Sequence, residues 1–330
     1  MKQTNILVTG GAGFIGSNLV KQIEIEYPYA NIFVFDKFNN GAKRSNQHFE
    51  FYGDYRNLIN FKGCVIPGDL QSESDVNKLL ARKFDIIFHQ AAISDTTVTD
   101  QNEVLNTNTH SFLYFLEYVK QNNCKLIYAS SAGVYGNSKS PNGIGEGEIP
   151  ENIYGFSKLS MDNLVRSFLR QNPSAHVVGL RYFNVYGPGE IYKRRTSSMI
   201  LQLYKQYLDK GKVRLFKYGE QTRDFVYIKD VINANIKAID GLSGIYNVGS
   251  GVSRSFNDIV SILEKNLETK IDIEYFENPY SFYQNNTCAD LSTSHTGLNF
   301  YPAFSLEDGI ADYTKEIVSY TQNDWKYFYE

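Results

Sequence analysis

The sequence predicts an α/β protein built on a doubly wound parallel sheet, with a smaller, partly interleaved C-terminal α+β lobe. Two observations carry this prediction. Short apolar and β-branched runs alternate with amphipathic helical stretches through about the first 180 residues, and after that the alternation loosens. With 330 residues, of which 42% are hydrophobic, the chain can form one large domain or two smaller ones around a sizeable core.

The alternating elements belong to an N-terminal domain expected over residues 1–181. Runs such as NILVT, NIFVF and FDIIF are rich in β-branched and aromatic residues, as strands are. Parallel strands need crossovers, which the intervening helices provide on both faces of the sheet. The expected strands are 5–9, 31–35, 64–66, 84–88, 125–129 and 176–180, and the expected helices are 14–25, 72–81, 102–121 and 153–171.

The C-terminal lobe is expected over residues 182–222 and 249–330, with returns to the N-terminal domain near 223–248. Segments 224–238 and 244–248 are placed to rejoin the main sheet, which would interleave the two lobes. The expected strands of the lobe are 213–216 and 271–275, and its expected helices are 198–207, 256–267 and 306–319.

Composition argues against several classes of partner. The net charge of −3 gives no reason to expect a nucleic acid or an acidic membrane. The three dispersed cysteines form no CxxC, which is typical of reduced thiols, and the five histidines show no zinc-site spacing. No signal-peptide core follows the first lysine, and no run approaches the ~20 apolar residues of a membrane span. We therefore expect a cytoplasmic protein without a metal.

A glycine-rich turn between the first strand and the first helix predicts a dinucleotide site. Gly10, Gly13 and Gly16 satisfy GxxGxxG, and Gly11 with the last two satisfies GxGxxG. Glycine permits the tight turn and the close approach of backbone to a pyrophosphate, whose charge the helix N-terminus favours. An ordinary glycine-rich turn would not need this strand–turn–helix context.

The residues after the second strand bear on the choice between NAD and NADP. Asp36 ends that strand about twenty residues after the glycines, where an acid takes the ribose hydroxyls of NAD. Lys37, Lys43 and Arg56 follow, and they can either meet the 2′-phosphate of NADP or form a solvated basic loop. Asp69, after the third strand, can contact the adenine or cap a helix.

A Tyr–Lys pair predicts acid/base chemistry. Tyr154 and Lys158 lie four apart on an expected helix and therefore on one face. A lysine ~4 Å away at an effective dielectric of ~20 would stabilise the phenolate by ~4 kcal/mol, or about three pKa units. The phenolate could then take a hydroxyl proton as hydride leaves. Ser131, at the end of the fifth strand, would bind the same oxygen, and Asn108 would hold a water or a carbonyl near Lys158.

Two alternatives to this pair are weaker. The same YxxxK spacing recurs at Tyr135 and Lys139, but VYGNSKSPNG is too rich in turn residues to be helical. A non-catalytic dinucleotide sensor would be free to lose Tyr154 or Lys158, and both are present.

Three groups of motifs in the same order resemble the extended short-chain dehydrogenase/reductase family. They are TGGAGFIG, then SSAGVYG with YGFSK, then RYFNVYGPGE with RDFVYIKD, and they cover nearly the whole chain. Within the family the chain is most similar to the ADP-L-glycero-D-manno-heptose 6-epimerases, through HQAAISDTT, the lysine of GPGEIYKRRTSSM, and YQNNTCADL. The resemblance implies a Rossmann-type fold, a homo-oligomer, and a place in the synthesis of lipopolysaccharide inner-core precursors.

It also implies a mechanism. Tightly bound NADP, rather than NAD, would oxidise C6 of ADP-D-glycero-D-manno-heptose, and hydride would return to the other face. Tyr154 would act as one acid/base and Lys193 as the other, unless Lys193 only contacts a phosphate. Lys37 stands where the family more often has asparagine.

The resemblance further implies two sets of binding residues. Those for the cofactor are Gly10, Gly13, Phe14, Ile15, Gly16, Asp36, Lys37, Lys43, Arg56, Asp69, Ala91, Ala92, Asn108, Tyr154 and Lys158. Those for the nucleotide sugar are Ser94, Ser131, Asn184, Lys193, Phe216, Arg223 and Tyr283.

Two relatives of this chemistry compete. A UDP-sugar 4-epimerase would share Ser131, Tyr154 and Lys158 and would not need Lys193. A 4,6-dehydratase places an Asp-Glu pair just after the strand-five Ser or Thr, where this chain has Ala132 and Gly133. Without an acid there, dehydration is not expected.

Overall fold

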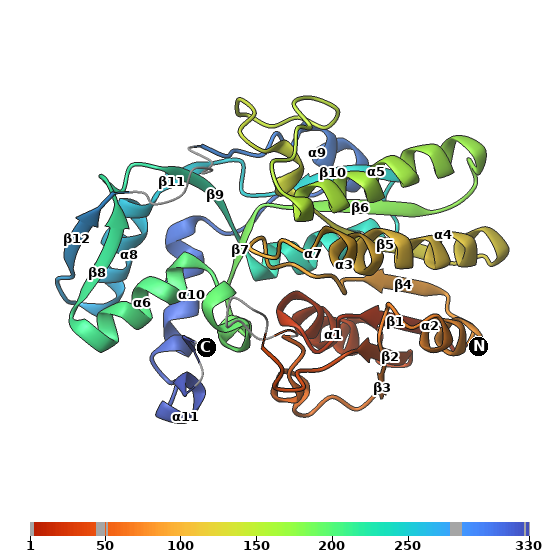
Figure 1. Cartoon of the computed structure of the whole chain (residues 1–330), viewed down its shortest axis with the longest axis horizontal. Coiled ribbons are helices and arrows are strands. Elements are labelled where there is room, and N and C mark those ends of the chain that lie inside the picture. Colours follow the sequence, from red (N-terminus) through yellow and green to blue (C-terminus); the bar gives the residue numbers. More distant parts are fainter. Residues whose placement is uncertain (1–2, 44–49, 51, 278–285, 327, 330) are drawn as a thin grey trace.

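The main sheet is parallel, and its strand order creates a crevice at one edge. The computed structural model describes residues 3–43, 50, 52–277, 286–326 and 328–329. Within these residues the strands run in the order β10-β6-β5-β4-β1-β2-β3 (Figure 1). The chain moves outward from β1 to β3, then crosses to β4 on the other side. This reversal leaves a crevice at the carboxyl ends of β1 and β4, where doubly wound sheets bind ligands. The strands are β1 (Asn5–Thr9), β2 (Asn31–Asp36), β3 (Cys64–Pro67), β4 (Ile86–His89), β5 (Lys125–Ser131), β6 (Val177–Tyr182) and β10 (Gly244–Val248).

Helices cover both faces of the sheet, because successive strand residues point in opposite directions. In β1, Ile6 and Val8 belong to one buried cluster and Leu7 to another. The first cluster also contains residues of helices α1 and α7, and the second contains residues of α2, α4 and α5. The predicted doubly wound fold is therefore confirmed. The helices are α1 (Phe14–Glu26), α2 (Glu73–Leu80), α4 (Ser111–Gln121), α5 (Ile153–Gln171) and α7 (Ile228–Ala238).

One predicted helix differs in detail. The segment expected as a single helix over 102–121 consists of α3 (Gln101–Leu105), a π-helical turn η2 (Asn106–His110) and α4. Asn108 lies in the middle of this turn, and its side chain hydrogen-bonds to the backbone of Ile93, which belongs to the loop after β4. Bulges of this kind are frequent at functional sites.

The smaller lobe lies at the left of Figure 1. Segments β8 (Lys212–Phe216) and β12 (Asp272–Phe276) pair in parallel, while β7 (Asn184–Tyr186), β9 (Thr222–Tyr227) and β11 (Ser253–Ser255) form another sheet. Strand β10 joins the main sheet beside β6, but β9, also considered for that sheet, pairs with β7 and β11 instead. The other elements are η1 (Tyr55–Leu58), η3 (Ala132–Tyr135), η4 (Glu190–Thr196), α6 (Met199–Lys210), α8 (Phe256–Leu267), α9 (Ser292–Leu298), α10 (Leu306–Ile317) and α11 (Gln322–Trp325).

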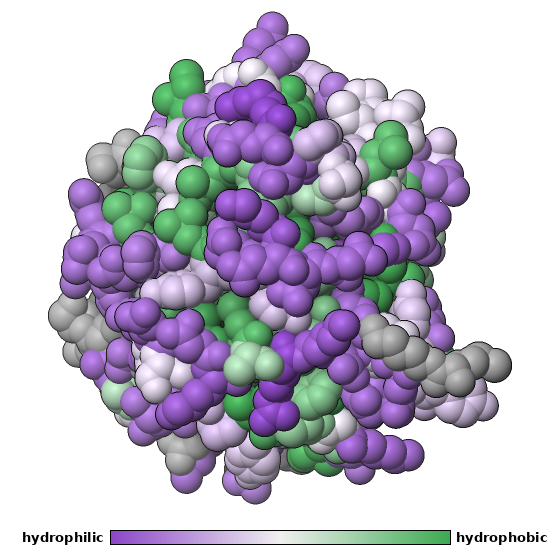
Figure 2. All heavy atoms as spheres, turned by 90° about the vertical axis from the view of Figure 1, so that its right-hand side faces the viewer, coloured by the Kyte–Doolittle hydropathy of each residue, from purple (hydrophilic) through white to green (hydrophobic). Residues whose placement is uncertain are grey.

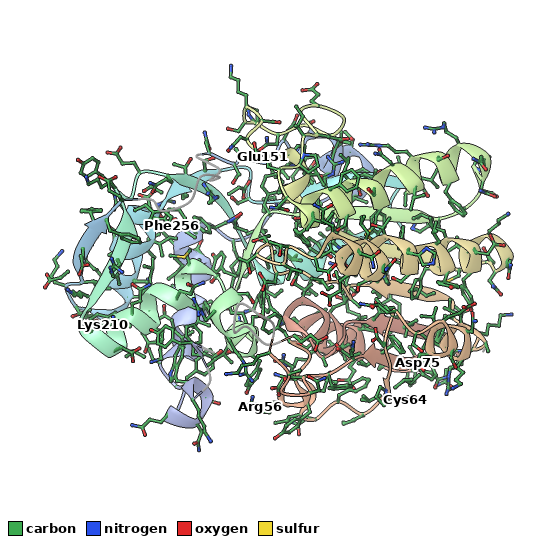
Figure 3. The ribbon with its side chains drawn as sticks, viewed as in Figure 1. Arg56, Cys64, Asp75, Glu151, Lys210 and Phe256 are labelled. Atoms are coloured by element: carbon green, nitrogen blue, oxygen red, sulfur yellow. The ribbon has the colours of Figure 1, made fainter. Side chains whose placement is uncertain are left out.

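The surface over the main domain is largely hydrophilic, with small apolar patches between polar side chains (Figure 2). Among the described residues, no helix has the length and apolar character needed to cross a membrane. The three cysteines are free thiols, and Cys64 is exposed on the outer strand β3 (Figure 3). Cys124 is buried, and burial raises the pKa of its thiol to about 12.

Candidate active site

The turn between β1 and α1 requires glycine at two positions. Gly10 has φ +69°, and a Cβ there would lie 2.7 Å from the backbone nitrogen of Ala91. A Cβ on Gly16 would lie 2.2 Å from the Gly10 oxygen. Gly13 begins α1 without any side-chain cap. The first amides of α1 thus lack a side-chain acceptor where the turn borders a cavity, which suits a bound pyrophosphate.

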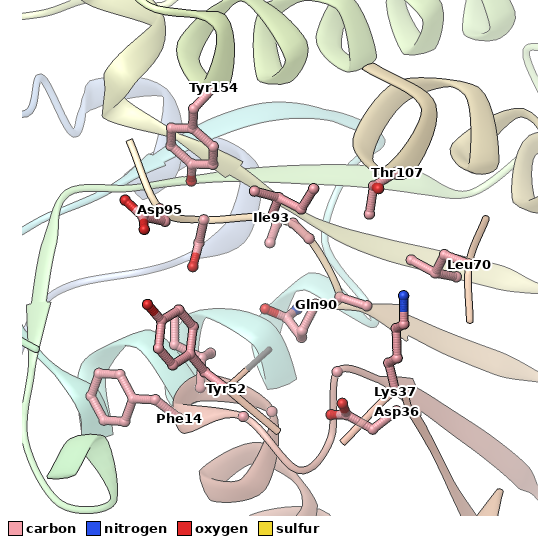
Figure 4. A pocket seen from close by; sticks show the side chains of 18 of the residues that line it. Phe14, Asp36, Lys37, Tyr52, Leu70, Gln90, Ile93, Asp95, Thr107 and Tyr154 are labelled. Carbon is pink, nitrogen blue, oxygen red and sulfur yellow. The ribbon is translucent and has the colours of Figure 1, made fainter. Parts of the chain in front are cut away.

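A cavity of about 310 Å³ extends along the carboxyl ends of the main strands (Figure 4). We call its two ends the adenine end, lined by Asp36, Lys37 and Asp69, and the catalytic end, lined by Ser131, Tyr154 and Lys193. Most of the residues expected to bind cofactor or substrate line this cavity. They are Gly10, Gly13, Phe14, Ile15, Gly16, Asp36, Lys37, Asp69, Ala91, Ala92, Ser94, Ser131, Tyr154, Lys158 and Lys193.

At the adenine end, a buried carboxylate is tied to the glycine turn. Asp36 Oδ2 accepts a hydrogen bond from Ala12 N at 2.8 Å, and Oδ1 accepts one from Phe38 N at 3.2 Å. Burial raises the pKa of Asp36, although these backbone bonds favour the anion. Lys37 Nζ lies 2.6 Å from Asp69 Oδ2, so a lysine and an acid face each other where the adenosine would lie.

At the catalytic end, the side chains of Ser131 and Tyr154 interact and both line the cavity. Ser131 ends β5, and its Oγ also accepts Gly133 N at 3.0 Å. Tyr154 lies in the first turn of α5, whose start is capped by Asn152. Burial raises the pKa of Tyr154, and the interaction with Ser131 lowers it. Ser131 therefore influences the protonation of Tyr154 at the cavity wall.

Lys158 contacts a main-chain carbonyl. Its Nζ donates to Ala129 O at 2.9 Å and lies 5.9 Å from the centre of the Tyr154 ring. Burial lowers the pKa of Lys158 to about 8, and the charge of Asp162 opposes that shift. The bond to the Ala129 carbonyl fixes the ammonium of Lys158 near Tyr154, and stabilisation of the phenolate by this lysine stays a prediction. Ser131 is the neighbour that lowers the Tyr154 pKa here.

A buried polar network joins α5 to the strands β5 and β6 that it covers. Asp162, one turn after Lys158, accepts the hydroxyls of Tyr128 at 2.8 Å and Ser130 at 3.0 Å. Its Oδ2 also lies 2.7 Å from Arg181 Nη2. Arg181 is fully buried and pairs with Glu148 at 2.7 Å, which ties the loop before α5 to the sheet.

Lys193 reaches the catalytic end from a different element. It lies on η4, and its Nζ is 5.7 Å from the centre of the Phe14 ring. Burial lowers the pKa of Lys193, and the charges of Glu190 and Asp95 raise it. The fold thus brings two groups that can carry a proton, Tyr154 and Lys193, to one end of the cavity.

Three expected cofactor residues do not line the cavity. Lys43 is exposed on the loop after β2. The Arg56 guanidinium donates two hydrogen bonds to Asp54, at 2.9 and 2.8 Å. Its central carbon lies 4.1 Å from the ring centre of Tyr192. These contacts direct Arg56 away from the cavity. Asn108 is fully buried, and its amide donates to the Ile93 carbonyl at 3.1 Å and to Ser157 Oγ, beside Lys158, at 3.0 Å, as expected for a contact with a backbone carbonyl near that lysine.

Three of the residues expected at the nucleotide sugar, Asn184, Phe216 and Arg223, lie in or beside the smaller lobe and outside the cavity lining. Asn184 is exposed on β7. The ring centres of Phe216 and Phe276 are 4.9 Å apart. The guanidinium carbon of Arg223 lies 5.9 Å from the ring centre of Phe256. Phe256, at the start of α8, is labelled in Figure 3. Tyr283 lies outside the described residues.

Sequence reasoning missed several cavity residues. Gln90 follows β4 and Tyr182 ends β6, and their side chains share a hydrogen bond of 3.1 Å. Asp95 follows β4 in the same loop as Ser94. The rule that ligands bind at the carboxyl ends of parallel strands was the signal that could have found all three. In the part of the chain that the structure describes, no group of three His, Cys, Asp or Glu side chains could hold a metal ion.

Comparison with known proteins agrees with this geometry. The model of the "NAD dependent epimerase/dehydratase family" matches residues 6–249. The chain belongs to this family. The resemblance to extended short-chain dehydrogenases and reductases is thereby confirmed, and an isomerase is the class of enzyme that follows.

Three relatives within this family are informative. The chain is 34% identical, over 320 residues, to an ADP-L-glycero-D-manno-heptose-6-epimerase of Brachyspira hyodysenteriae, covering 94% of this chain and 96% of that protein. The crystal structure of the Helicobacter pylori enzyme of that name matches with 47% identity and a TM-score of 0.88, covering 96% of this chain and 97% of the other. The UDP-glucuronic acid 4-epimerase of Bacillus cereus, in complex with UDP-glucuronic acid and NAD, matches with 29% identity and a TM-score of 0.80, covering 95% and 100%.

Proposed function

We propose that this epimerase-family protein converts ADP-D-glycero-D-manno-heptose into ADP-L-glycero-D-manno-heptose at C6, by transient oxidation with tightly bound NADP. The observation that carries the proposal is the catalytic end of the cavity, which Tyr154 enters from α5 and Lys193 from η4. An epimerase must reach one hydroxyl from opposite sides, so two proton-carrying groups on separate elements suit the reaction. The 47% identity to the Helicobacter pylori heptose epimerase supports the choice of substrate.

The residues of the catalytic end divide the work. A bound nicotinamide dinucleotide supplies the hydride acceptor and the returning hydride. In one orientation of the sugar, Tyr154 takes the proton of the C6 hydroxyl while Ser131 hydrogen-bonds the same oxygen. In the other orientation, Lys193 delivers a proton to the oxygen of the re-forming hydroxyl. Lys158, held by the Ala129 carbonyl, keeps a positive charge behind Tyr154.

The choice of NADP rests on the adenine end. Asp36 is engaged with the glycine turn through Ala12 N, and Lys37 extends over the same end of the cavity. A lysine there can bind a 2′-phosphate. Lys37 would then leave its ion pair with Asp69 and bind the phosphate instead. NAD would lack this contact.

The remaining parts of the proposal follow from the family. Residues 182–222 and 249–330 would hold the nucleotide sugar, with Asn184 at the sugar, Phe216 and Arg223 at the nucleotide and Tyr283 at the pyrophosphate. The protein would act as a homo-oligomer in the cytoplasm, in the synthesis of lipopolysaccharide inner-core precursors.

A second candidate is a UDP-sugar 4-epimerase, which the likeness to the Bacillus cereus enzyme favours. One assay separates the two. Purified protein receives ADP-D-glycero-D-manno-heptose or UDP-glucose, without added cofactor, and anion-exchange chromatography resolves the products. Conversion of the heptose alone supports the proposal and shows that the cofactor co-purifies. Conversion of UDP-glucose alone would favour the 4-epimerase over the heptose epimerase. Lys193 would then bind substrate rather than transfer a proton.

A further inference from the structure

The loop after β4 carries a carboxylate in a fixed position. Asp95 Oδ1 accepts hydrogen bonds from the backbone nitrogen and the hydroxyl of Thr97, at 2.9 and 2.6 Å. The loop itself is clamped by Asn108, whose amide accepts Ile93 N at 2.8 Å and donates to Ile93 O at 3.1 Å. Asp95 is 5% exposed, so its charge lies in a largely desolvated environment. A carboxylate in such an environment acts strongly on the charged groups that share its cavity.

Lys193 lines the same cavity, and the charge of Asp95 acts on it. Asp95 lines the same end of the cavity as Tyr154 and Lys193, and Figure 4 shows Asp95 and Tyr154 among the side chains that line the cavity. The acidic charges that act on Lys193 come from Glu190, on its own η4 segment, and from Asp95, on the loop after β4. On the side of α1, it faces the ring of Phe14.

The two acids differ in what they can do. Glu190 has the larger effect on Lys193, but it is fully buried and accepts hydrogen bonds from Ser198 N, Ser198 Oγ and Gly187 N. It does not line the cavity, so it acts as a fixed charge that holds η4 together. Asp95 borders the space in which the reacting groups meet.

The chemistry of the proposed function, on which this step rests, gives that position a meaning. Tyr154 gains a proton in the oxidation, and Lys193 loses one in the reduction. One turnover therefore ends with a phenol and a neutral amine, although it began with a phenolate and an ammonium. The next turnover in the same direction requires one proton to move from Tyr154 to Lys193, with no net gain or loss. A carboxylate that lines the same cavity and whose charge acts on Lys193 favours that return.

We propose that Asp95 is a positioning residue for the second acid/base, which returns Lys193 to its ammonium form after each turnover. It acts through Lys193 and need not touch the sugar. Burial disfavours the ammonium, and the two carboxylates offset that cost. Of the acidic charges that act on Lys193 among the described residues, removal of Asp95 leaves Glu190, and Lys193 then loses its proton at lower pH.

The test is the pH profile of kcat in Asp95→Asn, with Asp95→Glu as the conservative rescue. Asparagine keeps an oxygen that can accept both Thr97 bonds, so the loop is retained while the charge is removed. Asp100→Asn is the matched control, since Asp100 lies in the same loop and caps α3, a task that asparagine performs equally well. We expect the alkaline limb of Asp95→Asn to move to lower pH, with kcat reduced roughly tenfold on that limb, less than the ~10²–10⁴-fold typical of losing an acid/base outright. KM should stay near the wild-type value, and Asp95→Glu should restore the profile.

A second measurement does not depend on turnover. Lysine labelled with ¹³C at Cε reports its own titration by NMR, and the Lys193 signal is assigned by its loss in Lys193→Met. In Asp95→Asn the titration of Lys193 should move to lower pH, and in Asp100→Asn it should not. Unchanged titration and an unchanged alkaline limb in Asp95→Asn would overturn the inference, as would a shifted titration with an unchanged limb. Failure of the wild type to epimerise the heptose would instead remove the proposed function, and the NMR result would still decide whether Asp95 and Lys193 form a charge pair.

Discussion

The two ends of the cavity are built differently. At the catalytic end, Tyr154 and Lys158 stand on a 19-residue helix whose underside is anchored by the buried pair Asp162 and Arg181. At the adenine end, Lys37 and Asp69 form an ion pair whose side chains are 34% and 28% exposed. Desolvated pairs hold their geometry and are costly to break, whereas exposed pairs are worth little and exchange partners readily. The catalytic end is therefore the fixed part of the site, and the adenine end the adjustable one.

The largest effect is expected for Tyr154→Phe. Loss of the hydroxyl removes a proton carrier, so kcat should fall towards the upper end of the ~10²–10⁴-fold range for general acid/base catalysis, with little change in KM. Steady-state turnover of the heptose measures it. Tyr135→Phe is the control, because Tyr135 has the same spacing to a lysine but is buried against Asn247. A comparable fall in both variants would mean that the fixed end is sensitive to packing rather than to proton transfer.

Lys193→Met should be next in size, with kcat reduced roughly 10²–10³-fold. Only one of the two half-reactions needs Lys193, so a single turnover should still reduce the cofactor, and reduced nicotinamide should accumulate in its absorbance band. Arg195→Met, an exposed neighbour on η4, should turn over like the wild type. A wild-type rate in Lys193→Met would contradict the scheme with two acid/base groups and would leave Tyr154 as the one proton carrier of the scheme.

The sequence anticipates the fixed end better than the adjustable one, for a physical reason. The bounds of β1, α5 and α8 follow from local periodicity and capping, and the glycine turn follows from its steric demands. Arg56 was expected at a phosphate because its charge is visible in the sequence, but its bond to Asp54 and its stacking on Tyr192 are tertiary contacts that no spacing reveals. For Asn108 the sequence indicates a contact with a backbone carbonyl, but only the fold identifies that carbonyl as the one of Ile93, which lies in another segment. Asp95 needed the fold to show that it shares a wall with Lys193.

A smaller effect, on stability, is expected at Glu148. Its pairs with Arg166 and Arg181 lower the pKa of Glu148 to about 2, against the desolvation that would raise it. A carboxyl whose folded-state pKa is depressed contributes stability above its unfolded pKa and loses that contribution as pH falls through the folded value. A shift of this size corresponds to about 3 kcal/mol, and solvent screening of a half-buried carboxylate reduces the expected contribution at neutral pH to about 2 kcal/mol. That contribution should disappear between about pH 4.5 and about pH 2.

Urea unfolding as a function of pH checks this expectation. Glu148→Gln should be less stable at neutral pH by that amount and should show a shallower loss of stability in acid than the wild type. Glu146→Gln, an exposed position on the same loop, should leave the acid limb unchanged. Parallel acid limbs for the wild type and Glu148→Gln would show that the buried network does not distinguish the catalytic end.

The smallest effect is expected at the adjustable end, where Lys37→Ser should lower the affinity for NADP about tenfold, as the loss of one partly exposed charged contact would, and leave that for NAD nearly unchanged. Fluorescence titration of the cofactor-free protein with each dinucleotide gives the ratio of the two affinities. Asp69→Asn is the informative companion, because it frees Lys37 from its ion pair and should strengthen NADP binding relative to NAD. An equal loss for both dinucleotides in Lys37→Ser would mean that Lys37 supports the pocket through Asp69 rather than by binding a phosphate. In that case the adenine end would be as fixed as the catalytic end, and the choice of cofactor would depend on Asp36 and the glycine turn.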